Sequence, residues 1–221
     1  MRMPLRRLLH YVVIAAGYAL GAAALWVGRP REIPPSWHVM DGGDIWLGGA
    51  MVAFLLPTAS AVTFGLQRCL HPWSRVTRQS DTADVTAVYD AIVLQATVFI
   101  FGIHVTVLAG LFGVLWGREW AGQIVPILLG FVMIGIGNLL PKTRPNLAIG
   151  IRTRHTLSDR TLWIRVHRSA GYIAGASGAV IVLSAIAVPR PVGPGIILVV
   201  GPAALVGTWL LVRSSRKDAG V

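Results

Sequence analysis

The chain has 221 residues, of which 54% are hydrophobic and only 13% are charged, and its formal net charge is +11. A soluble domain of this length carries about 25% charged residues, so the composition argues against a soluble globular protein. The single cysteine, Cys69, excludes an internal disulfide and a cysteine-ligated metal cluster.

Six apolar stretches follow one another along the chain and are separated by short polar segments. Stretches of about twenty residues span a bilayer as α-helices, and the lack of strict alternation argues against a membrane β-barrel. The six predicted helices cover residues 8–27, 47–67, 88–116, 122–140, 169–188 and 193–212. We therefore predict an all-α, polytopic membrane bundle that forms a single transmembrane domain. Within it, residues 1–70 form an N-terminal hairpin and residues 88–213 form a four-helix part.

The basic residues are distributed unequally between the two sides of this bundle. Sixteen of the 20 lysines and arginines fall on the side that holds both termini. The other side holds Arg29, Arg31, Arg118 and Arg190. The positive-inside rule predicts a bacterial inner-membrane protein with both termini in the cytoplasm. The lipid bilayer is thus its first expected partner, and we expect no direct binding of nucleic acid, because a basic excess in such a protein reports topology and contact with anionic lipid.

Residues 31–46 form the predicted outer loop between the first two spans. Pro34 and Pro35 stiffen this loop. Its potential metal ligands are His38, Asp41 and Asp44. Three candidate ligands in a loop are weak support for a metal site, so we expect solvated polar groups there, with no metal and no cofactor.

Residues 138–168, which we call the basic segment, separate the fourth and fifth predicted spans. From Lys142 onward it holds seven basic residues and one acid, Asp159. Pro141 ends the preceding helix, and the spacing of Thr156 and Asp159 predicts a cap that starts a short helix near residue 158. Trp163 and His167 then share one face of that helix. The segment is either a platform that binds an anion or a partner, or a grip on lipid headgroups.

The predicted binding residues of the basic segment are Asn138, Lys142, Arg144, Asn146, Arg152, Thr153, Thr156, Trp163, His167 and Arg168. Together with Gly137, Pro141, Pro145, Gly150, Ile151 and Leu157, they resemble the signature of the SdpI family of bacterial immunity proteins. Residues 33–38 resemble the proline-histidine motif of a membrane domain of unknown function that commonly precedes it. That motif adds Pro35, Trp37 and His38 to the predicted binding residues. The chain departs from the family at Arg154-His155, where Pro-Trp is usual, and at residues 36–38.

The resemblance implies immunity to a secreted toxic peptide, coupled to signalling in which the membrane protein captures a cytoplasmic transcriptional repressor. The toxic peptide and the repressor are thus its implied partners, and no enzymatic activity is expected. Two alternatives remain: a small-molecule or ion transporter, and a membrane-embedded enzyme acting on a lipid or an anionic substrate. His104, at membrane depth, is either a proton relay or a neutral histidine hydrogen-bonded between helices. His10 is expected at the inner interface.

Overall fold

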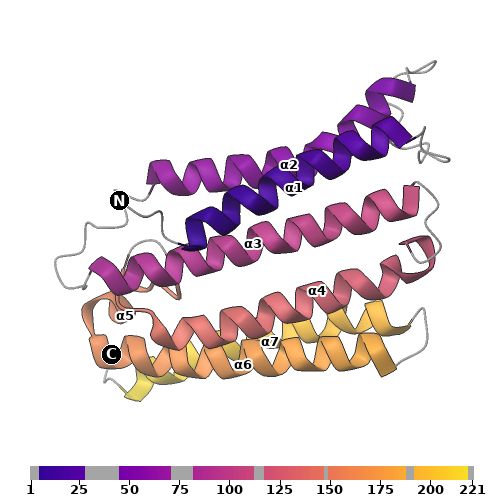
Figure 1. Ribbon diagram of the computed structural model, residues 1–221. Coiled ribbons are helices and arrows are strands. Elements are labelled where there is room, and N and C mark those ends of the chain that lie inside the picture. The colour runs from indigo at the N-terminus through magenta and orange to yellow at the C-terminus, as the bar shows by residue number, and fades with distance from the viewer. Residues whose placement is uncertain are drawn as a thin grey trace. The chain divides into compact units, whose positions relative to one another are not determined.

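The computed structural model describes residues 5–27, 45–70, 82–111, 117–146, 149–187 and 192–218, and its regular elements there are all helices (Figure 1). They are α1 (Leu5–Val27), α2 (Ile45–Leu70), α3 (Thr82–Leu111), α4 (Gly117–Leu139), η3 (Leu140–Lys142), α5 (Arg154–Ser158), α6 (Arg160–Ala187) and α7 (Val192–Asp218). The all-α prediction is confirmed. Pro35, Trp37 and His38 of the predicted outer loop lie outside the described residues.

Five described helical segments are long and apolar enough to cross a membrane. They are Leu5–Val27, Gly49–Cys69, Ala87–Leu111, Gln123–Lys142 and Arg160–Ala187. Helix α7 contributes a shorter apolar stretch, Val199–Ser214. Leu183 and Leu205 stay 65% and 74% exposed, as is expected of side chains that face lipid rather than a protein core. The chain is therefore a multi-pass membrane protein, and a sixth span at α7 remains a prediction.

The chain divides into two compact units, and each is described by itself. Unit 1 consists of Met1–Leu66 and Ala96–Val125. Unit 2 consists of Gln67–Gln95 and Pro126–Val221, so it contains the basic segment. The unit boundaries at residues 95/96 and 125/126 fall inside α3 and α4, so each of these helices has one part in unit 1 and the other part in unit 2.

Two polar contacts fix the register of α1 against α3 in unit 1. His10 Nδ1 lies 3.3 Å from the Thr97 hydroxyl, and His104 Nε2 lies 3.2 Å from the Gly17 carbonyl oxygen. Both pairs are separated by 87 residues, so the two helices run parallel and the contacts recur after seven residues, about two helical turns. His10 is buried in the helix packing, since its side chain is only 1% exposed and stacks on Phe64 of α2.

Helix α2 comes close to α1 where Pro57 interrupts its backbone hydrogen bonding. A proline has no N–H, so the carbonyl four residues earlier, that of Ala53, has no helical donor. Gly21 of α1 lies directly against this carbonyl, and a Cβ at Gly21 would overlap with it. Two helix backbones can approach this closely only because the contact residue has no side chain.

Glycines also set the contact between α4 and α6 in unit 2. A Cβ on Gly171 would lie 2.7 Å from the carbonyl oxygen of Gly137 and 2.9 Å from Pro141 Cγ. A Cβ on Gly178 would lie 2.5 Å from the carbonyl oxygen of Gly130. Helix α6 further packs against α7, η3 and α5, so it is the central helix of this unit.

Candidate functional site

The basic segment begins where α4 ends in a turn of tighter helix. Pro141 occupies the start of η3, and both the backbone N–H and the hydroxyl of Thr143 donate to the carbonyl of Leu140, at 3.0 and 2.7 Å. These bonds satisfy a carbonyl that the end of α4 would otherwise leave unpaired, and they fix the direction in which the chain leaves the helix.

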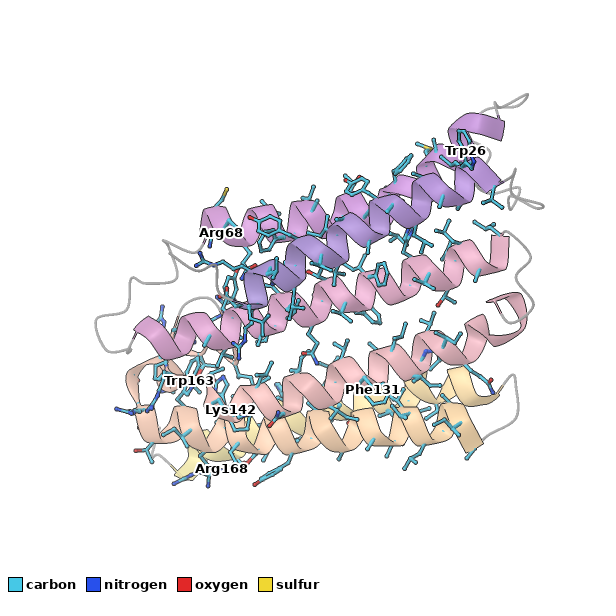
Figure 2. All side chains as sticks on the ribbon, in the orientation of Figure 1. Trp26, Arg68, Phe131, Lys142, Trp163 and Arg168 are labelled. Carbon is cyan, nitrogen blue, oxygen red and sulfur yellow. The ribbon has the colours of Figure 1, made fainter. Side chains whose placement is uncertain are left out.

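Trp163 of α6 ties this turn to the next helix. Its side chain is completely buried, and its indole N–H donates to the carbonyl oxygen and the hydroxyl of Thr143, at 3.2 and 3.1 Å. Its ring stacks on that of His167, with centroids 3.9 Å apart and an interplanar angle of 16°. Figure 2 shows Trp163 and Lys142 near each other at one end of unit 2. The predicted shared face of Trp163 and His167 is therefore confirmed, and it points inward.

Both ring nitrogens of His167 are hydrogen-bonded to the backbone, and one of them holds the basic segment at Ile151. Nε2 lies 2.9 Å from the backbone N–H of Ile151 and must accept this hydrogen bond, so it carries no proton. Nδ1 lies 2.8 Å from the carbonyl of Trp163 and therefore donates. The bonds assign a neutral ring with its proton on Nδ1. Since both nitrogens are used within the fold, His167 is not a free acid or base for catalysis.

Gly150 brings the backbone against this stacked pair. Its φ of +114° is the only positive φ among the described residues, and side chains are disfavoured in that conformation. A Cβ there would overlap with His167 Nε2 and lie 3.1 Å from Trp163 Cζ2. The path of the backbone at this point thus depends on the glycine both for its backbone angle and for its close approach to the two rings.

The cap of the short helix differs from the predicted one. The hydroxyl of Thr153 accepts from the N–H of Thr156 at 3.1 Å, and the hydroxyl of Thr156 accepts from the N–H of Thr153 at 2.9 Å. The prediction of a cap formed by Thr156 and Asp159 is wrong, because Thr156 also donates to the carbonyl of Ile151, at 2.7 Å, and so sits inside α5. Asp159 instead accepts from the N–H groups of Thr161 and Leu162 at the start of α6, the helix that was predicted from about residue 158 to carry Trp163 and His167, and α6 continues into the fifth predicted span.

Asn146 shapes the middle of the segment. Its side chain is 1% exposed, and it donates to the carbonyl of Arg144 at 2.6 Å and accepts from the N–H of Ile149 at 2.8 Å. Like Trp163, His167 and Thr156, it is part of a buried frame. We use "buried frame" for the buried side chains of Thr143, Asn146, Thr156, Trp163 and His167 together with the two residues they hold, the half-buried Thr153 and the exposed Gly150.

The remaining predicted residues lie outside the buried frame. Asn138 and Lys142 are exposed, one turn apart, and joined by a 3.1 Å hydrogen bond. Arg152 is exposed beside the frame, and Arg144 is half-buried. Arg168 is exposed and projects from the side of α6 opposite Trp163 (Figure 2). The predicted set therefore separates into a fixed interior and an exposed basic surface, with Arg168 away from the frame.

Sequence reasoning missed Thr143 and Ile151 as partners of the two rings. Ile151 contributes only its backbone N–H, and Thr143 contributes its backbone carbonyl as well as its hydroxyl. Backbone groups are the same in every residue type, so no pattern of side chains identifies them. The described residues contain no group of three or more histidine, cysteine, aspartate or glutamate side chains that could hold a metal ion.

Comparison with protein families gives one match. Residues 142–213 match the model of the SdpI/YfhL protein family, so the match runs from the end of η3 into α7 and includes most of the buried frame. No curated protein and no solved structure matches the chain significantly. Residues 142–213 of the chain are therefore similar to the SdpI/YfhL protein family.

Proposed function

We propose that this SdpI-like membrane protein protects its cell against a secreted toxic peptide and captures a cytoplasmic transcriptional repressor through the basic segment. The family match supports the proposal. The observation that carries it is the buried frame, which holds one face of the segment in a fixed shape while basic side chains stay exposed around it.

A fixed shape favours a protein partner over lipid. Attraction to anionic headgroups requires only positive charge near the membrane surface, and a loop without internal order would supply it. Here indole, imidazole and hydroxyl groups are all satisfied internally, which rigidifies the backbone between the two helices. Guanidinium groups on such a support can meet carboxylates of a partner in two-point hydrogen bonds. The partner surface is therefore expected to be acidic.

The sidedness of this function follows from the distribution of charge. The positive-inside rule supports a cytoplasmic basic segment, where a repressor is accessible. The loop of residues 31–46 is then on the outer side and forms part of the surface that meets the toxic peptide. Replacing Trp37 and His38 with alanine is expected to weaken protection while the protein still reaches the membrane. Unchanged protection would refute this assignment of the outer loop.

A non-enzymatic role is supported by the family and by His167. An enzyme that works through the basic segment would need an acid–base group, and the histidines of this segment are His155 and His167. Both nitrogens of His167 are committed to Ile151 and Trp163. Turnover of a lipid by the purified protein would favour the enzyme, and substrate flux into proteoliposomes would favour a transporter.

Protection is tested by expressing the chain in a sensitive bacterium and challenging it with secreted toxic peptides, beginning with any peptide that is encoded beside its gene. Survival that depends on the chain is expected. A frame variant, Trp163→Ala, serves as the matched loss-of-function control, since it removes the buried ring at the centre of the site. Equal survival with and without the chain, when the chain is present in the membrane, would refute the immunity proposal.

A further inference from the structure

A small cavity lies among α1, α2 and α3 of unit 1, at membrane depth. It is lined by Val13, Ile14, Gly17, Pro57, Ser60, Phe101 and His104. It offers about 10 Å³ to the centre of a water molecule. A cavity needs at least about 10–15 Å³ in this measure to hold one water, so its size is that of a single molecule. Its only polar side chains are those of Ser60 and His104.

His104 presents an acceptor that the protein does not satisfy. The side chain is 1% exposed, and its Nε2 must donate to the carbonyl oxygen of Gly17, which has no proton to give. In the neutral ring, Nδ1 is then a bare acceptor. Within the part of the chain that the structure describes, no protein group hydrogen-bonds to this buried Nδ1. An unpaired buried acceptor lowers the stability of the folded protein, and a hydrogen-bond donor placed beside it would remove this cost.

We propose that this cavity is a binding site for one water molecule, which donates a hydrogen bond to His104 Nδ1 and is also held by the hydroxyl of Ser60. Water fits because the ligand must be a hydrogen-bond donor of this size and needs at least two polar partners. The apolar remainder of the lining leaves no charged group to hold an ion. In this arrangement unit 1 holds one water molecule against a neutral histidine within the membrane, and none of the residues involved belongs to the basic segment.

His104 and His167, two of the buried histidines, carry their protons on different ring nitrogens, and this difference provides an internal control. The bonds of His104 require the proton on Nε2, whereas those of His167 require it on Nδ1. His104 has a nitrogen left for water, and His167 has none. The full chain, labelled with ¹⁵N-histidine and reconstituted in phospholipid vesicles, distinguishes them by solid-state NMR, with His104→Gln and His167→Gln identifying the signals.

For His104 we expect an Nδ1 signal shifted to the position of a hydrogen-bonded acceptor and transfer of magnetisation from water to the ring. For His167 we expect the opposite tautomer and no such transfer. Ser60→Val fills the cavity and is expected to abolish the transfer to His104 while leaving the His167 signals unchanged. A proton on His104 Nδ1, or no transfer from water to His104 in the unmodified chain, would overturn the proposal without recourse to any variant.

Discussion

Replacing Gly150 with alanine tests how the buried frame holds the basic segment. The positive φ costs an alanine about 1–2 kcal/mol. The new Cβ also overlaps with His167 Nε2, and the ring cannot move aside without losing its stack on Trp163. Displacing it breaks the hydrogen bond from Ile151, which adds about 1–1.5 kcal/mol. Together, these two effects of Gly150→Ala are expected to lower the local stability of the basic segment by about 2–3.5 kcal/mol.

Trypsin measures this local opening, because Arg152 and Arg154 lie directly beyond Gly150. When opening and closing are fast relative to cleavage, the cleavage rate follows the open population, and each tenfold change corresponds to about 1.4 kcal/mol. In detergent micelles, Gly150→Ala is expected to accelerate cleavage at these arginines by about 30- to 300-fold.

The double variant Gly150→Ala/His167→Ala isolates the overlap with the ring. Without the imidazole, only the backbone strain remains, so the additional cost of Gly150→Ala is expected to fall by about 1–1.5 kcal/mol, roughly tenfold in rate. The same cost of Gly150→Ala with and without His167 would refute the reasoning, because the contact between Gly150 and the ring would then contribute nothing.

Three further predictions concern packing, the indole bond and topology. Gly171→Ala is expected to lower the thermal stability of the protein in detergent, because its Cβ meets the backbone of α4, whereas Gly175→Ala, with no atom within 4 Å of its Cβ, is expected to be tolerated. Equal midpoints for the two variants would contradict the packing described. Trp163→Phe keeps the ring stack but loses the bond to Thr143, so it is expected to cost about 1–2 kcal/mol by tryptic cleavage, and no change would mean that the indole N–H contributes nothing. Reporter fusions are expected to place both termini and the basic segment in the cytoplasm, and a cytoplasmic location for residues 31–46 would reverse the orientation.

The helices could be predicted from the length of the apolar stretches, and the shared face of Trp163 and His167 from their spacing of four residues. That this face points inward was not predicted, because contacts with other segments bury it. The cap formed by Thr153 and Thr156 could not be predicted from the sequence, since the contact that fixes Thr156 is a hydrogen bond to a backbone carbonyl, that of Ile151. The burial of His10 was missed for a related reason. Its position near the end of a span suggests an interface, but Thr97 and Phe64 on other helices bury it.

The predicted role of Asn146 also changes with the structure. Its amide is consumed by the backbone of residues 144 and 149, so a substitution there would disturb the frame and would not report directly on a partner. A substitution of Arg152 distinguishes binding of a partner from attraction to lipid more directly. Arg152 is exposed beside the frame, and attraction to lipid headgroups does not require its planar guanidinium group.

Arg152→Lys therefore tests the central proposal most directly, with Arg165→Lys as a control that is equally exposed in the same segment but was not among the predicted binding residues. Both variants keep the charge, so attraction to lipid is preserved in each. Protection against the toxic peptide and retention of the repressor at the membrane would be measured at matched membrane levels of protein. A loss with Arg152→Lys and none with Arg165→Lys is the expected result. Wild-type protection and wild-type repressor retention in both variants would contradict a partner-binding platform and leave the basic segment as a membrane anchor.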